Sequence, residues 1–132
     1  MPIPQPHLDL KLMDVQLAVC RLEPAGDLPA WALDAGSFSS VTRTAGECSV
    51  VCSEDVVPPG VQCERGWRIF QVAGPLDFGL TGILASIAGP LADAGVSVFA
   101  LSTYDTDYVM VKAQTVDQAT RALETAGHRV WR

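Results

Sequence analysis

The second half of the chain alternates between short apolar strands and amphipathic helices, and this order limits the fold more than any other feature. Apolar alternation typical of strands covers residues 67–73, 97–101, 108–112 and 128–131. Two stretches between these strands, residues 81–94 and 115–126, repeat apolar side chains at helical spacing. The order strand, helix, strand, strand, helix, strand predicts an α+β, ferredoxin-like βαββαβ fold. That fold has one antiparallel sheet with both helices on one face.

Several residues predict where these two helices begin and end. Thr81 is expected to cap the first helix, and Thr115 is expected to cap the second in a capping box with Gln118. Each helix is followed by a glycine suited to a helix C-terminus, Gly95 and Gly127. Pro90 lies inside the first helix and is expected to bend its last turn.

The first half has strands but no second good helix. Residues 8–22 alternate twice with a change of parity near Met13, which predicts one strand with a bulge. Residues 23–35 predict a loop with at most a short helix, and residues 37–44 and 47–52 predict a hairpin. A linker with the sequence PPG follows over residues 53–65. We interpret this half as a degenerate copy of the second, although identity between the halves is too weak to establish a repeat.

The predicted central hairpin, residues 97–101 and 108–112, is apolar on both of its faces. An antiparallel sheet with one wet face normally alternates apolar and polar side chains more cleanly. We therefore expect the first half or a second subunit to cover this hairpin, and we expect a homodimer.

Length and charge limit the class of protein and its partners. The chain has 132 residues, enough for one compact domain or two very small ones. Fifteen acidic residues against nine basic ones give a net charge of −6, which argues against nucleic acid or an anionic membrane as the main ligand. No apolar run is long enough to span a membrane, and the N-terminus lacks the pattern of a signal peptide. A cytoplasmic protein is expected.

The four cysteines are expected to be reduced thiols in this compartment. Cys48 and Cys52 have a spacing that invites a zinc hypothesis, but they lie in a predicted strand. Residues four apart on a strand are about 13 Å apart, too far to share one metal. We expect small buried core thiols and no metal.

Catalytic motifs are absent from the sequence. It has no nucleophile elbow, phosphate-binding loop, zinc-protease motif or dinucleotide fingerprint. Asp105 and Asp107 could hold a proton or a cation at a turn, but solvated turn carboxylates are the commoner outcome. The chain is expected not to be an enzyme and to need no cofactor, and an enzyme using these two carboxylates is the least favoured hypothesis.

Two polar segments instead indicate ligand binding. The glycine-rich loop 74–82 opens a helix, whose free backbone N–H groups and positive dipole end suit a carboxylate. The segment 102–107 ends an otherwise apolar hairpin. Together they would suit a zwitterion, with the helix start for its carboxylate and Asp107 for its ammonium. The alternative is that Gly74, Gly79 and Gly82 only shape the turn and allow close helix packing.

The same segments resemble a known family. Residues 74–83 (GPLDFGLTGI), 87–92 (IAGPLA) and 102–107 (STYDTD) resemble the ACT-domain subfamily that includes the CASTOR-type arginine sensors and many bacterial proteins. Residues 38–44 and 47–52 resemble the shortened first ACT unit of those bacterial proteins. The resemblance spans about residues 10–131. It implies two ACT units in tandem, a shortened unit at 8–62 and a complete ACT domain at 63–132.

The resemblance also implies an amino-acid ligand at an interface between ACT units. The ligand's carboxylate or backbone would lie near Asp77, Gly82 and Ile83. Its amine and side chain would lie near Thr103, Tyr104 and Asp107. The loop that carries acidic residues in the arginine-sensing relatives reads FGL at residues 78–80 here, so arginine is not the first expected ligand.

Two functions remain open from the sequence. The leading hypothesis is a non-enzymatic regulatory module that binds an amino acid or a similar small zwitterion as a homodimer. The alternative is a protein-interaction module with a vestigial pocket, whose apolar sheet face docks a partner.

Overall fold

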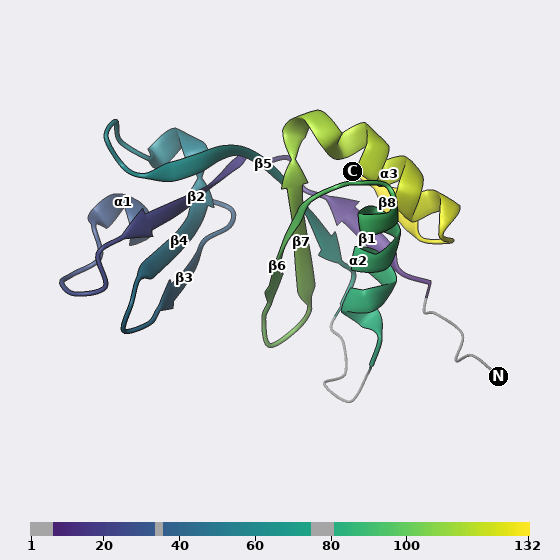
Figure 1. Ribbon diagram of the computed structural model, residues 1–132, viewed down its shortest axis with the longest axis horizontal. Coiled ribbons are helices and arrows are strands. Elements are labelled where there is room, and N and C mark those ends of the chain that lie inside the picture. The colour runs from purple at the N-terminus through teal and green to yellow at the C-terminus, as the bar shows by residue number, and fades with distance from the viewer. Residues whose placement is uncertain (1–6, 34–35, 75–80) are drawn as a thin grey trace. The chain divides into compact units, whose positions relative to one another are not determined.

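A computed structural model describes residues 7–33, 36–74 and 81–132 of the chain (Figure 1). It divides into two compact units. The larger unit comprises Met1–Asp14 and Arg68–Arg132, and the smaller unit comprises Val15–Trp67. The long strand β5 (Cys63–Val72) runs from the smaller unit into the larger one. This division differs from the predicted boundary at residues 62 and 63, because the first strand of the chain is part of the larger unit.

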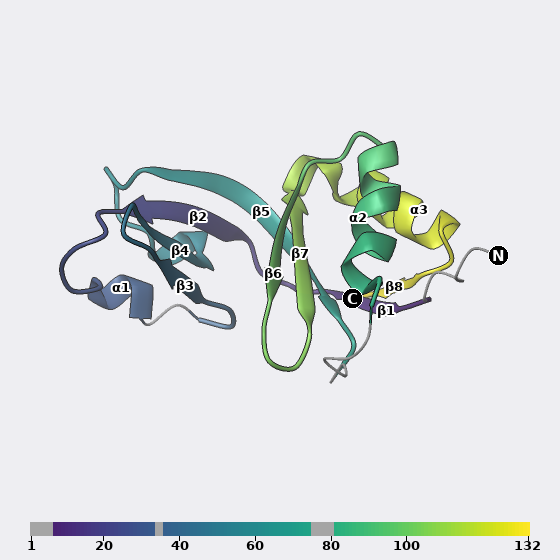
Figure 2. The same ribbon diagram turned by 60° about the horizontal axis from the view of Figure 1, so that its bottom comes forward.

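The larger unit holds the βαββαβ order that the sequence predicts. After β5 come α2 (Ile83–Asp93), β6 (Val98–Ser102), β7 (Asp107–Lys112), α3 (Val116–Thr125) and β8 (Arg129–Trp131), with a short 3-10 turn, η2 (Ala113–Thr115), before α3. The sheet order in this unit is β6-β7-β5-β1-β8, and β1 is Asp9–Leu12. Both helices lie on one face of the sheet (Figure 2). The structure thus confirms the α+β, ferredoxin-like fold.

The strand β1 is an addition that the sequence pattern does not predict. It lies between β5 and β8, antiparallel to β5 and parallel to β8. The prediction of one bulged strand over residues 8–22 is wrong, because these residues form β1 and a separate strand, β2 (Leu17–Leu22). Both strands pair with β5, but with different parts of it: Leu10 is opposite Val72, and Leu17 is opposite Trp67. The change of parity near Met13 marks the passage from one strand to the next.

The core of the larger unit lies between its sheet and the two helices. Alternate residues of three strands face α2 and α3 there, and the buried cluster contains Leu10, Leu12, Phe70, Val72, Ile87, Leu91, Val96, Val109, Val111, Val116, Ala119 and Leu123. Burial of this apolar surface is the main force that holds the helices on the sheet.

His128 holds the start of β1 in this unit. The imidazole is 5% exposed, its Nδ1 accepts a hydrogen bond from the Leu8 N–H at 3.1 Å, and its Nε2 lies 2.8 Å from the Ser86 carbonyl. Because Nδ1 accepts, Nε2 carries the proton and donates to Ser86. One side chain therefore joins β1, α2 and the residue before β8.

The smaller unit is an antiparallel sheet in the order β3-β4-β2-β5, with β3 at Ser40–Arg43 and β4 at Cys48–Ser53. The predicted hairpin is confirmed, and so is the short helix in the loop before it, α1 (Ala30–Leu33). Its core combines Ala18, Cys20, Ala32, Cys48, Val50, Cys52 and Val57.

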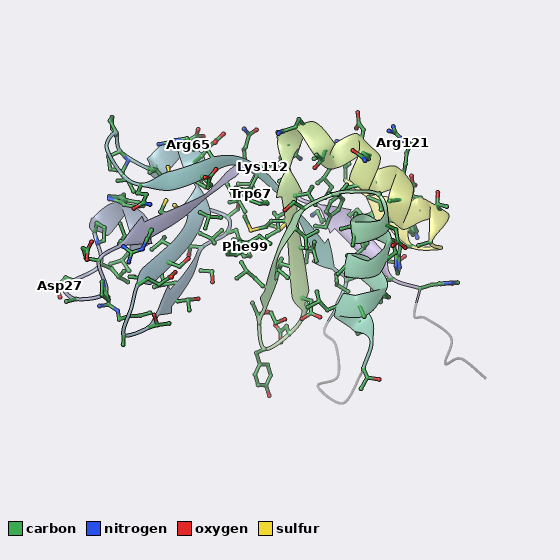
Figure 3. The ribbon with its side chains drawn as sticks, in the orientation of Figure 1. Asp27, Arg65, Trp67, Phe99, Lys112 and Arg121 are labelled. Carbon is green, nitrogen blue, oxygen red and sulfur yellow. The ribbon has the colours of Figure 1, made fainter. Side chains whose placement is uncertain are left out.

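The segment predicted as a linker has more structure than expected. It contains the 3-10 turn η1 (Glu54–Val56), and β5 begins inside it at Cys63. Arg65 is a residue of β5 (Figure 3). Its guanidinium donates to the Glu54 carbonyl at 2.9 Å and to the Val57 carbonyl at 3.3 Å. These contacts join the turn to β5, so residues 53–65 are anchored to the sheet.

The helix ends match the predictions at the C-termini but not at the N-termini. Gly95 and Gly127 have positive φ values of 75° and 98° and follow α2 and α3 as predicted. The N-cap of α2 is Gly82, not Thr81. Thr115 does stand at the N-cap of α3, but its hydroxyl donates to the Lys112 carbonyl, and Gln118 donates to the Ala94 carbonyl. The predicted capping box therefore does not form.

Candidate functional site

The two polar segments singled out in the sequence meet at one end of the larger unit, where β5 ends. The chain leaves β5 at Val72 and enters α2 at Ile83. The turn between β6 and β7 reaches the same end, because the Thr106 hydroxyl donates to the Val72 carbonyl at 2.7 Å. Figures 1 and 2 both show the hairpin turn and the first turn of α2 at this end of the unit.

The hairpin turn is closed by its own hydrogen bonds. The Thr103 N–H donates to the Thr106 carbonyl at 2.8 Å, and the Thr103 hydroxyl donates to the same oxygen at 3.1 Å. Thr106 is 5% exposed, whereas Tyr104 at the tip is 82% exposed. The turn therefore has one buried anchor and an open outer side.

Asp107 is the charged residue of this hairpin that faces the helices. It begins β7 and has the same parity as Val109 and Val111, which are in the core beneath α2 and α3. The side chain is half-buried, and within the described ranges its carboxylate has no hydrogen bond or ion pair. An anion in this position can accept a hydrogen bond from a cationic ligand group.

Ser102 is a further polar residue on this face, and it is not among the six ligand-binding residues that the resemblance implies. It is the cross-strand partner of Asp107, so both side chains lie on the same face of the sheet. Alternation along β6 would have identified it, since Val98, Ala100 and Ser102 share one parity.

The start of α2 supplies the opposite charge. Gly82 is the N-cap, exposed and in the left-handed conformation, with φ of 78°. The Ser86 N–H donates to the Gly82 carbonyl at 2.9 Å and closes the first turn, so the N–H groups before it have no partner within the helix. No acidic side chain lies in that first turn to neutralise the helix dipole.

The start of this helix has open space at Gly82. A Cβ built on Gly82 would meet no heavy atom within 4 Å, whereas the Ile83 side chain is buried, at 8% exposure. The structure therefore brings five of the six predicted residues to one end of the unit: Gly82, Ile83, Thr103, Tyr104 and Asp107. The sixth, Asp77, lies outside the described residues.

This arrangement provides two complementary charges at one end of a sheet. The helix start presents partial positive charge, suited to a carboxylate, and Asp107 presents a full negative charge, suited to an ammonium group. Within the described residues, no group of three or more His, Cys, Asp or Glu side chains is placed to hold a metal ion.

Comparison with known proteins gives the family of this fold. A model of the ACT domain matches residues 62–125, and a second model, of an N-terminal domain, matches residues 16–60. The human cytosolic arginine sensor for mTORC1 subunit 1 is 37% identical over 59 residues, 44% of this chain and 18% of the sensor. Residues 62–125 are therefore an ACT domain. The protein is related to the CASTOR-type arginine sensors, and the match spans less than a fifth of their length.

Solved structures extend the likeness to nearly the whole chain. A protein of Agrobacterium tumefaciens is 36% identical, with a TM-score of 0.90 over 96% of this ACT-domain chain and 95% of that one. Aspartate kinase of Clostridium acetobutylicum has a TM-score of 0.66 over 96% of this chain and 36% of the kinase. At 13% identity, that second likeness shows the fold alone. Among the described helices, none is long and apolar enough to cross a membrane.

Proposed function

We propose that this ACT-domain protein is a non-enzymatic regulatory module that binds an amino acid at the end of the larger unit. The ligand's carboxylate meets the first turn of α2, and its ammonium meets Asp107. The observation that carries the proposal is the unpaired Asp107 carboxylate on the face that α2 covers, at the end where α2 begins. A zwitterion matches this pair of charges better than a simple anion or cation does.

We assign a role to each of the remaining predicted residues. Gly82 leaves room for a ligand at the helix start, because no described atom lies where its side chain would be. We assign Thr103 and Tyr104 to the ligand's amine and side chain by their place in the same turn as Asp107 and by resemblance to the family. We assign Asp77 to the carboxylate end by its resemblance to the family.

We also propose that the ligand lies at an interface between ACT units of a homodimer. Thr103, Tyr104 and Gly82 are exposed in the single chain, so one copy leaves the outer side of the site open. A second copy that covers this side would exclude water and strengthen the ion pair with Asp107. Light scattering at micromolar concentration is expected to give twice the chain mass of 14.0 kDa, and a monomer would contradict this part.

The relatives support a regulatory role in the cytoplasm. The related human protein is named a cytosolic arginine sensor. The tandem arrangement, with a shortened first ACT unit formed by the smaller unit, is part of the same proposal. The ligand here need not be arginine, because the site has one described carboxylate facing the helices and a guanidinium would need more partners.

A thermal-shift screen against the twenty amino acids tests the proposal. A ligand that binds only the folded protein raises the unfolding midpoint once its concentration exceeds the dissociation constant. We expect one amino acid, or a chemically related few, to raise the midpoint. Its N-acetyl derivative, which lacks the ammonium, should not. If no amino acid shifts the midpoint, the binding proposal fails and the protein-interaction module with a vestigial pocket becomes the favoured function.

A further inference from the structure

All four cysteines lie on one face of the smaller unit's sheet. Cys20 of β2 is opposite Val50 of β4, so Cys48 and Cys52, two residues to either side of Val50, share its face. On the other side of β2, Cys20 is directly opposite Cys63 of β5. All four thiols are free. The face that packs against α1 is therefore rich in sulfur.

The hydrogen-bond pattern fixes the geometry between Cys20 and Cys63. The Arg21 N–H donates to the Gln62 carbonyl at 2.9 Å, which makes these two residues a hydrogen-bonded pair. The neighbouring pair, Cys20 and Cys63, is then a non-hydrogen-bonded pair, with side chains close together and Cα atoms about 4.5 Å apart. That distance lies within the range of about 4.4–6.8 Å that a disulfide requires.

Cys52 is near Cys20 but is less well placed for a bond. It is opposite Ala18, so it is the diagonal neighbour of Cys20. Diagonal neighbours have Cα atoms about 7–8 Å apart, beyond the reach of a disulfide without backbone movement. The Cys52 thiol also lies against the Cys20 thiol, but only Cys63 is directly opposite Cys20 in the backbone register and so within the Cα distance of a disulfide.

Access from solvent distinguishes the two partners. Cys63 is half-buried, whereas Cys20 is buried, at 1% exposure. Burial, with smaller contributions from Cys52 and Cys63, raises the pKa of the Cys20 thiol to about 12. A small oxidant in solution therefore meets Cys63 first.

We propose that Cys63 and Cys20 form a reversible redox pair that small-molecule disulfides such as oxidised glutathione convert to a cross-strand disulfide. The Cys63 thiolate attacks one sulfur of the small disulfide and releases one small thiol. Cys20 then attacks the Cys63 sulfur, passes its proton to the departing sulfur and releases the second small thiol. The two protein thiols lose two electrons and two protons in total, and the small disulfide is reduced to two thiols. The new bond joins β2 to β5 across the smaller unit.

The test is to incubate the full chain with oxidised glutathione, block the remaining thiols and map the peptides by mass spectrometry. We expect a linked pair of peptides that contain Cys20 and Cys63, with Cys48 and Cys52 blocked as free thiols. A reducing agent should restore four free thiols. Cys52→Ala is the matched control, because it removes the diagonal neighbour of Cys20 and should leave the linked pair in place. Cys63→Ser should abolish the link.

Three results would overturn the proposal. The first is wild-type protein that keeps four free thiols under oxidised glutathione. The second is stable attachment of glutathione to Cys63 while Cys20 stays free, because the second attack would then not occur. The third is a disulfide that includes Cys48 or Cys52 in the wild-type chain. All three results are measured on the wild-type protein, so the test remains valid even if a variant fails to fold.

Discussion

Asp107 and Asp105 are two residues apart, yet their surroundings differ. Asp105 is exposed within the turn, whereas Asp107 is half-buried at the start of β7 and shares a face with the core. Asp107→Asn should weaken binding of the amino acid found in the screen by about ten- to a hundred-fold, because a charge-assisted hydrogen bond is worth about 1.5–3 kcal/mol. Calorimetry measures this directly. Asp105→Asn is the matched control, and equal small effects of both changes would show that Asp107 is only a turn residue.

The raised pKa of the Cys20 thiol predicts that the protein loses stability at alkaline pH. Its pKa of about 12 in the folded protein lies above its ordinary value of 9.0, chiefly because of burial. The folded state therefore favours the neutral thiol. The contribution of Cys20 to the free energy of unfolding is fully present below about pH 9 and is lost as the pH rises toward about 12.

Urea unfolding at about pH 8 and about pH 11 checks this dependence. We expect wild-type protein to lose more stability between the two pH values than Cys20→Ala does. Val50→Ala is the control, since it removes volume from the same core face without removing a titrating group, and it should keep the wild-type dependence. The same loss in Cys20→Ala as in wild type would refute the assignment to this thiol.

The polar segment 102–107 could be recognised from the sequence as a group, but the structural roles of its two threonines could not be predicted. Thr106 is the anchor, because it bonds to the Val72 carbonyl, 34 residues earlier in the chain. Thr103 closes the turn. Such roles depend on partners that only the folded chain brings near. The position of Asp107 on the helix-covered face, in contrast, follows from simple alternation along β7.

At the scale of elements, apolar periodicity located both long helices and most of the strands correctly. It did so because a helix or strand that buries one face needs apolar side chains at its own period, and that period is visible in the sequence. The helix N-termini were less predictable. The Thr115 hydroxyl bonds back to Lys112, and Gln118 bonds to the end of α2, so local capping competes with other partners.

Gly82 and Gly89 provide a matched test of the start of α2. Both have open space where a Cβ would stand, but only Gly82 has a positive φ. Gly82→Ala should lower the free energy of unfolding by about 1–2 kcal/mol through backbone strain. Gly89→Ala, inside the helix, should raise it by about 0.5–1 kcal/mol. Urea unfolding of both variants measures the two effects, and a Gly82→Ala protein as stable as wild type would contradict the left-handed N-cap.

At the scale of the whole molecule, the sheet order was the part that sequence pattern could not supply. Each strand could be recognised from its own residues, but the place of β1 between β5 and β8 depends on pairing between distant segments. Its position is held by Leu10 and Leu12 in the core and by the hydrogen bond from Leu8 to His128. His128 comes three residues after the end of α3, and nothing in the sequence around it signals that contact.

The most direct test of the proposed function is a two-dimensional amide NMR spectrum of the ¹⁵N-labelled protein, titrated with the amino acid that stabilises it. Binding between the first turn of α2 and the end of the β6–β7 hairpin should shift the amide signals of Gly82, Ile83, Thr103, Tyr104 and Asp107 together, with one saturation curve. The amides of α3 around Arg121, which lies beside the C-terminal end of α2 and not beside its first turn, should move little. Saturable shifts that leave Gly82 and Asp107 unchanged and lie elsewhere in the molecule would contradict the account.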